Sequence, residues 1–249
     1  MQINWPLVIF LFCLAIPGVL IATPKLIGLL LPDNSEQVRS RFSFIVIVQN
    51  LIMVFLMSLA GVALSSRTGL SDPILEGLLQ GKPVLDLVQP VVLPVLALTL
   101  FGLTLFFVLY YGVVGRLLDT VSLLALKKLR AVFGLDGAAL YNGVVEEILI
   151  RWGLMNVIVF FMLLLLRKKT DFVFWTAIIL SGLMYMLTHL PVYIAAGCKN
   201  SRRFVYLMLA LNCFQSVLFG WIFWHHGILA AICSHLIFNL GWYLYDSKL

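Results

Sequence analysis

Long runs of apolar side chains dominate this chain, and they restrict it to a fold inside a membrane. A helix that crosses the hydrocarbon core of a bilayer needs about 20 mostly apolar residues, because the core is about 30 Å thick and each residue advances the helix about 1.5 Å. The 249 residues are 62% hydrophobic and 11% charged, and their mean hydropathy is +1.07, which excludes an ordinary soluble domain. Runs of the required length cover 3–21, 42–64, 91–114, 144–166, 172–196, 206–224 and 227–245.

These runs predict an all-α fold, a polytopic transmembrane bundle of seven or eight spans. The net charge of +6 comes from basic residues in short clusters between the runs. That arrangement is typical of membrane topology rather than of nucleic-acid binding. With seven spans, the positive-inside rule predicts a multi-pass membrane protein whose C-terminus lies in the cytoplasm.

Two intervals between the spans differ from simple loops. Asp72–Pro90 mixes apolar residues with acids, glycines and prolines, which predicts a short interfacial helix and a turn. Arg116–Leu135 has leucines at helical spacing and basic residues elsewhere on its surface, which predicts an amphipathic helix lying on the bilayer. We expect one continuous membrane domain, with N-terminal transmembrane and interfacial helices in 1–136 and a C-terminal core in 137–249.

Three charged residues lie at or inside the start of the fourth run, in the segment YNGVVEEILIRWG. They are Glu146, Glu147 and Arg151. A charge at the centre of a bilayer costs at least about 2.5–3.5 kcal/mol, so such residues face the interior of the bundle, form pairs or line a water-filled cavity. Three of them together predict a polar cavity within the membrane.

The spacing separates the two glutamates. On an α-helix Glu147 and Arg151 share a face at positions i and i+4 and can form an ion pair. Glu146 is rotated by about 100° from Glu147 and has no cation on its own face. A partly buried carboxylate without a cation is a candidate general base. The alternative interpretation is that all three residues only tie helices together.

Three more polar side chains occur in the next apolar runs. His189 follows Tyr185 by one turn, and His235 and Asn239 share a face at positions i and i+4. A single histidine in a span is usually a packing residue. Here these side chains and the glutamates fall in the fourth, fifth and seventh apolar runs, so they could converge on one cavity.

This set suits the attack of an activated water molecule on an amide carbonyl. Glu146 would act as the base and His189 would share the proton, while His235 and Asn239 would stabilise the oxyanion. The chain lacks a GxSxG nucleophile elbow, which disfavours an acyl-enzyme. We prefer a mechanism without a cofactor. Zinc held by Glu146, His189 and His235 remains an alternative, although the chain has no HExxH helix.

The motifs EExxxR, aromatic-xxx-His and HxxxN occur in this order between Gly137 and Tyr245. They resemble the three motifs of the CAAX-protease and bacteriocin-processing (CPBP, also called ABI) family of intramembrane endopeptidases. The resemblance implies a helical bundle around a membrane-embedded cavity. It implies the same catalytic roles for Glu146, His189, His235 and Asn239.

By the same resemblance, Glu147 and Arg151 would support the site. Tyr185 departs from the pattern, because phenylalanine is usual at this position in the family, and its hydroxyl needs a partner or water. The implied substrates are membrane-associated peptides or proteins, prenylated CAAX-type or other. A non-enzymatic scaffold or a bacteriocin-immunity-type protein that retains the motifs is the main alternative. A transporter with a proton relay ranks below both, because we find no inverted repeat.

Overall fold

The computed structural model describes residues 3–246, and these contain helices but no strands. Within that range seven helical stretches are long and apolar enough to cross a membrane. This confirms the predicted all-α, polytopic bundle. The stretches are Trp5–Leu30, Glu36–Thr68, Val84–Leu117, Thr120–Leu166, Asp171–Ala195, Arg202–His226 and Ile228–Asp246.

Some of these stretches contain more than one element. In chain order the elements are α1 (Trp5–Leu30), α2 (Glu36–Thr68), α3 (Pro73–Leu79), α4 (Val84–Phe107), η1 (Val108–Val114), α5 (Gly115–Leu117), α6 (Thr120–Gly137), η2 (Ala138–Val145), η3 (Glu147–Met155), α7 (Asn156–Leu166), α8 (Asp171–Ala195), α9 (Arg202–His226) and α10 (Ile228–Asp246). The η elements are π-helices.

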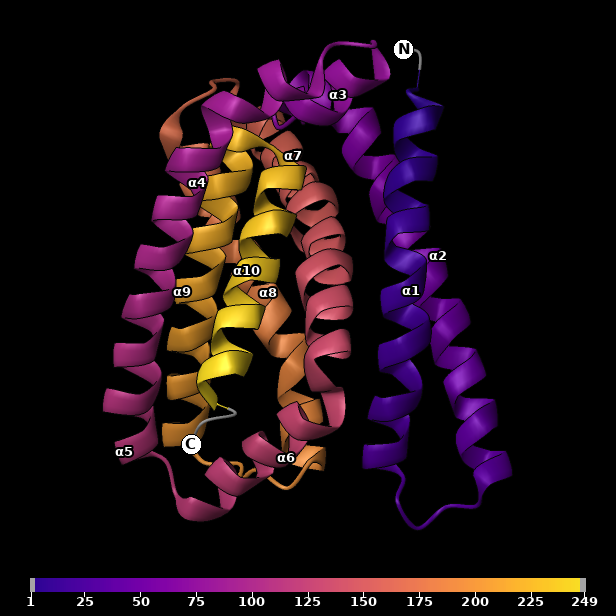
Figure 1. The fold of residues 1–249 in the computed structure, drawn as a ribbon, viewed down its shortest axis with the longest axis vertical. Coiled ribbons are helices and arrows are strands. Elements are labelled where there is room, and N and C mark those ends of the chain that lie inside the picture. The colour runs from indigo at the N-terminus through magenta and orange to yellow at the C-terminus, as the bar shows by residue number, and fades with distance from the viewer. Residues whose placement is uncertain (1–2, 247–249) are drawn as a thin grey trace.

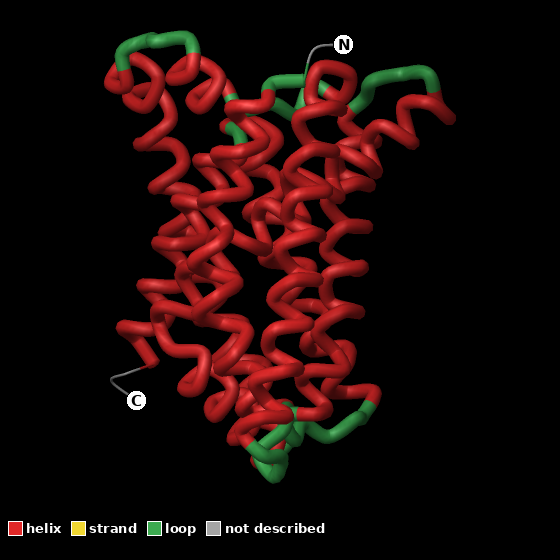
Figure 2. Tube along the Cα trace, turned by 90° about the vertical axis from the view of Figure 1, so that its right-hand side faces the viewer, coloured by secondary structure: helices red, strands yellow, loops and turns green. Residues whose placement is uncertain are grey.

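The long helices run side by side, and most loops gather at the two ends of the molecule (Figures 1 and 2). The hairpin of α1 and α2 lies on one side of the helix that ends in α7, and α9 lies on the other (Figure 1). Side chains from the loops set where several helices begin. Ser35 and Ser201, for example, each accept a hydrogen bond from the backbone N–H three residues on.

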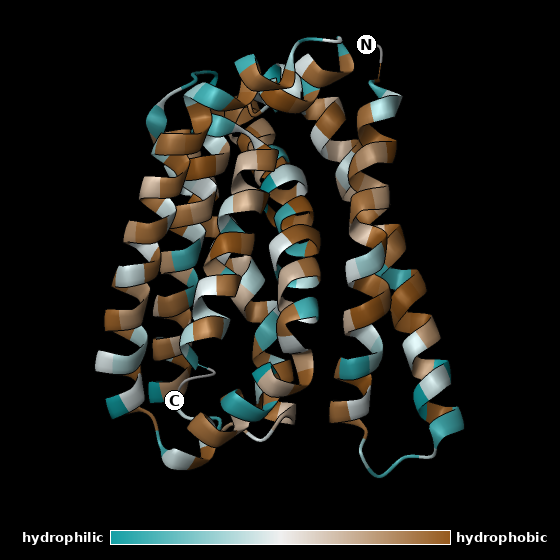
Figure 3. Ribbon diagram, in the orientation of Figure 1, coloured by the Kyte–Doolittle hydropathy of each residue, from teal (hydrophilic) through white to brown (hydrophobic). Residues whose placement is uncertain are grey.

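Most residues of the long helices are hydrophobic (Figure 3), and many of their large apolar side chains are exposed. Phe44, Leu93 and Leu165 are 69%, 75% and 82% exposed. Surfaces of this size are rarely left open to water in a soluble monomer. Together with the seven long helices, they identify an integral, multi-pass membrane protein.

Two glycines allow the α1–α2 hairpin to approach the helix that carries the glutamates. A Cβ atom at Gly18 of α1 would lie 2.3 Å from the backbone oxygen of Leu140, and one at Gly61 of α2 would lie 2.3 Å from Nε1 of Trp152. The Trp152 indole also donates a hydrogen bond to the backbone oxygen of Ser58, at 3.2 Å. The hairpin therefore packs directly against the η2–η3 segment.

The predicted bounds of the two unusual intervals are partly wrong. The first contains the short helix α3, but α4 already begins at Val84. The spanning helix continues through Pro90, which the sequence pattern placed in a turn, and through Pro94. In the second, α6 begins at Thr120 because Asp119 caps it. Its regular geometry is interrupted at Gly134, whose φ is 66°.

Candidate active site

The glutamates lie on an unusual stretch of helix. Glu146 separates the π-helices η2 and η3. A π-helix bonds residue i to i+5, is rare, and occurs frequently at functional sites. The two glutamates differ in what they face, because Glu146 contacts His189 and Glu147 contacts His235.

A cavity of about 970 Å³ opens beside this stretch. Helices from both halves of the chain line it, from α1 and α2 to α10. Its lining includes Glu146, His189, His235 and Asn239, while Glu147 and Arg151 are buried behind it. The four side chains predicted to be catalytic thus share one cavity within the bundle.

Glu146 has no partner on its own helix, as its spacing predicts, and it contacts α8 instead. Its Oε1 lies 3.4 Å from Nε2 of His189, and the two side chains are 6% and 27% exposed. Nδ1 of His189 lies 3.1 Å from the backbone oxygen of Tyr185. A carbonyl oxygen only accepts, so Nδ1 carries the hydrogen. Nε2 is then the nitrogen that faces the carboxylate.

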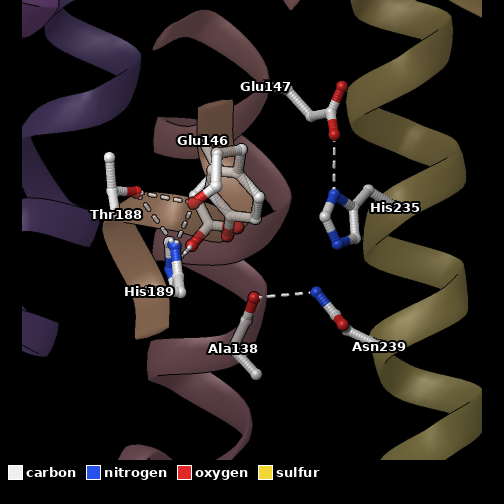
Figure 4. A network of polar contacts seen from close by, with 8 residues as sticks. Ala138, Glu146, Glu147, Thr188, His189, His235 and Asn239 are labelled. Atoms are coloured by element: carbon white, nitrogen blue, oxygen red, sulfur yellow. Dashed lines mark hydrogen bonds and ion pairs between the residues drawn. The ribbon is translucent and has the colours of Figure 1, made fainter. Parts of the chain in front are cut away.

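Tyr185 completes this group. Its hydroxyl interacts with the Glu146 carboxylate, and its ring lies 4.1 Å from the His189 ring, centroid to centroid. The hydroxyl that distinguishes this residue from the usual phenylalanine therefore has a partner in the site. Figure 4 shows Glu146, Thr188 and His189 together on one side of the polar network.

Glu147 is bound mainly to α10 rather than to its own helix. Its Oε1 accepts a hydrogen bond from Nδ1 of His235 at 2.8 Å, whereas its Oε2 lies 3.6 Å from Nε of Arg151. Sequence spacing predicted the contact with Arg151 but missed the shorter one. His235 also stacks on Phe219, with ring centroids 4.1 Å apart. Both contacts fix the plane of the imidazole.

Asn239 is oriented by the π-helix. Its Nδ2 donates to the backbone oxygen of Ala138 at 2.8 Å, as drawn in Figure 4. The second N–H of the amide remains for a group in the cavity. His235 and Asn239 are thus held by separate partners, Glu147 and Ala138, while both line the same space.

The zinc alternative requires Glu146, His189 and His235 to gather around one ion. Among residues 3–246, no group of three or more His, Cys, Asp or Glu side chains is arranged to hold a metal. Instead the two histidines pair with different glutamates. The described side chains therefore do not fit the zinc site that the sequence left open.

Asp119, in the loop before α6, caps the helix that contributes Leu126 and Arg130 to the cavity lining. The side-chain hydroxyl and backbone N–H of Ser122 donate to Asp119 and hold the pKa of that carboxyl below its usual value. Nearby, burial raises the pKa of the Cys198 thiol to about 11. A thiol with so high a pKa stays protonated and unreactive, which agrees with a packing role.

The comparison with family models yields a match to the description "Type II CAAX prenyl endopeptidase Rce1-like", over residues 128–241. Searches of curated proteins and of solved structures found no significant match. The matched range contains all three motifs and the cavity side chains of η2, η3, α8 and α9, together with His235 and Asn239 of α10. The α1–α2 hairpin lies outside it. Over residues 128–241 the chain is therefore similar to the Rce1-like CAAX protease family, in agreement with the resemblance carried by the three ordered motifs.

Proposed function

We propose that this protein is an intramembrane endopeptidase that hydrolyses a peptide bond with water activated by Glu146 and His189. The observation that carries the proposal is the pairing of these two side chains, 3.4 Å apart, on the wall of a cavity within the bundle. A carboxylate next to an imidazole can accept a proton from water and pass it on to a leaving amine. The family match makes proteolysis the expected class of reaction.

The arrangement of His189 supports this role. Its Nδ1–H is committed to the Tyr185 carbonyl, so only Nε2 is available to share a proton with Glu146. When water adds to the scissile carbonyl, Glu146 takes the proton. The Glu146–His189 pair then returns it to the nitrogen of the departing amine. The proton count balances, and no covalent acyl-enzyme is needed.

His235 and Asn239 would stabilise the negative charge that develops on the carbonyl oxygen. His235 donates through Nδ1 to the buried Glu147 carboxylate, and as an imidazolium it would also donate through Nε2–H to the oxyanion. Asn239 adds its second amide N–H. Each such donor contributes about 10²–10³-fold to the rate of acyl transfer in other enzymes.

The substrates we propose are membrane-associated peptides, with prenylated CAAX-type tails as the first class to test, because the family description contains that activity. The experiment is incubation of the purified protein with a quenched fluorescent peptide that ends in a farnesylated Cys-aliphatic-aliphatic-X tail. Release of fluorescence by the wild type but not by Glu146→Gln supports the proposal. Equal release by both proteins would contradict it.

Trapping with the Glu146→Gln variant in cell membranes extends the test to other substrates. A protease should accumulate an uncleaved substrate on this variant. A scaffold or immunity protein would instead keep its cellular function after this conservative change.

Exhaustive chelation provides the separate test of metal dependence. We expect activity to survive it, and a loss of activity that added zinc restores would replace the metal-free reaction by a zinc-dependent one.

The topology is also part of the proposal. We propose that the C-terminus faces the cytoplasm, as the distribution of basic residues predicts. A reporter fused after the last residue, active only in the cytoplasm, would test this orientation.

We further propose the division at residue 136 between supporting helices and catalytic core. The last three residues of that core, 247–249, lie outside the described residues.

A further inference from the structure

The cavity has a second set of polar side chains that the catalytic mechanism does not use. Four uncharged amides line it: Gln49 and Asn50 on α2, Asn142 on η2 and Gln215 on α9. Within the described part of the chain, none of these four amides has a hydrogen-bond partner. In contrast, Asn239, Asn212 and Asn156 all donate hydrogen bonds to backbone oxygens.

Gln49 is exposed, and Asn50, Asn142 and Gln215 are half-buried. Their amide groups are therefore not sealed inside a packed interface but are accessible to a ligand in the cavity that they line. Their common property is that each carries both a donor and an acceptor. A peptide unit carries the same two groups.

The positions of the four amides suit a chain that crosses the site. Asn142 precedes Glu146 by four residues on the same helix, so a substrate beside Glu146 also passes Asn142. Gln49 and Asn50 come from α2, and Gln215 comes from α9. These two helices lie on opposite sides of the helix that ends in α7 (Figure 1). An extended backbone lying between α2 and α9 would meet amides on both sides of the scissile bond.

We propose that Gln49, Asn50, Asn142 and Gln215 form a subsite that binds the backbone of the substrate in an extended conformation. The subsite depends on the proposed function for the identity of its ligand, a peptide. It assigns a binding role to α2, which lies outside the family match at residues 128–241. It recognises main-chain groups, so it fixes the register of the substrate without selecting its side chains.

Binding to an inactive protein tests the subsite separately from catalysis. The probe is a fluorescent, farnesylated Cys-aliphatic-aliphatic-X peptide, and its Kd is measured by anisotropy with Glu146→Gln protein in detergent. Asn50→Leu or Gln49→Leu, added to that protein, should each raise Kd about fivefold, because each removes roughly one hydrogen bond. Gln37→Leu, the same substitution on an exposed turn of α2 outside the cavity, should leave Kd within about twofold of the parent.

A second arm replaces single amides of the peptide by esters, which removes one backbone N–H at a time. At least one ester should weaken binding about fivefold to the parent protein but less than about twofold to the variant that has lost the matching amide. Unchanged Kd values in both α2 variants, or equal ester effects in parent and variants, would overturn the subsite. Neither result depends on cleavage, so failure of the proposed function would appear separately, as a wild-type protein that binds the probe but does not cut it.

Discussion

Two glutamate–histidine pairs lie side by side in this molecule, and they differ in distance and in exposure. Glu146 and His189 are 3.4 Å apart, and both line the cavity. Glu147 and His235 are 2.8 Å apart, and the glutamate is completely buried. The first pair is open to the cavity, whereas the second is closed off from it by burial of its glutamate. In the proposed function, adjacent residues of one helix therefore provide the reactive carboxylate, Glu146, and a supporting one, Glu147.

The largest expected effect on kcat comes from the open pair, Glu146 and His189. Glu146→Ala or His189→Ala should lower kcat by about 10²–10⁴-fold, the range for loss of a general acid–base group. The melting temperature should change little, because Glu146 faces the cavity and no buried cation depends on it. Peptide cleavage and thermal unfolding of the same detergent preparation measure both effects. Near-normal cleavage by both variants would remove the distinction between the pairs.

The closed pair should respond differently. Glu147→Leu should lower kcat by about 10²–10³-fold, because His235 loses the carboxylate that holds it as a donor. It should also lower the free energy of unfolding by about 3 kcal/mol, because the buried Arg151 guanidinium is left without its counter-ion. Thermal unfolding and cleavage assays measure the two losses.

The double variant Glu147→Leu/Arg151→Leu separates these losses. It removes both charges, so the melting temperature should recover while kcat stays low. Recovery of both quantities would show that the contact between Glu147 and His235 has no catalytic role. The comparison would then reduce to one active pair and one structural pair.

A smaller effect is expected at Tyr185, which belongs to the open pair alone. Tyr185→Phe restores the residue usual in the family and removes one hydrogen bond to Glu146. The value of kcat should fall about fivefold with KM unchanged. Tyr193→Phe is the matched control, since the Tyr193 hydroxyl also lies in the cavity but bonds Asn212. An equal loss in both variants would argue against a specific role for the Tyr185 hydroxyl.

The sequence predicts that Glu146 and His189 act together, but it does not predict the contact between Glu147 and His235. The reason is physical. Hydropathy gives the seven spans, because each must match the thickness of the bilayer. The cost of charge in lipid identifies Glu146, Glu147 and Arg151 as inward-facing. Spacing along one helix then gives the contact between Glu147 and Arg151, but it contains no information on contacts between helices. The bond between Glu147 and His235 joins residues 88 positions apart and was missed for that reason.

The helix geometry around the site was also beyond the sequence pattern. Periodicity was interpreted as α-helical throughout, and nothing in AALYNGVV or EILIRWGLM distinguishes a π-helix from an α-helix. The close approach of α1 and α2 at Gly18 and Gly61 depends on tertiary packing as well. The cavity wall supplied by α2 could therefore be found only in the folded chain.

A third buried carboxylate provides a reference for both pairs, because it has no histidine. Asp72 lies outside the spans and accepts backbone N–H groups of Leu75 and Leu229 at 2.7 and 2.6 Å. Burial raises the pKa of this carboxyl above 3.8 despite those bonds. The folded state therefore binds the proton more tightly than the unfolded state, and the contribution of Asp72 to stability falls as pH rises from about 3.8 through the folded pKa.

Asp72→Asn stays neutral at every pH and should escape this loss. Its melting temperature relative to the wild type should rise as pH increases across that window. The value of kcat should stay within about twofold, because Asp72 does not line the cavity. Thermal unfolding at a series of pH values, with cleavage at neutral pH, measures this smallest effect. A relative melting temperature that falls with rising pH would mean that the backbone N–H groups outweigh burial at Asp72. Burial alone would then not distinguish Asp72 from Glu147. The contact with His235 would be the feature that distinguishes Glu147.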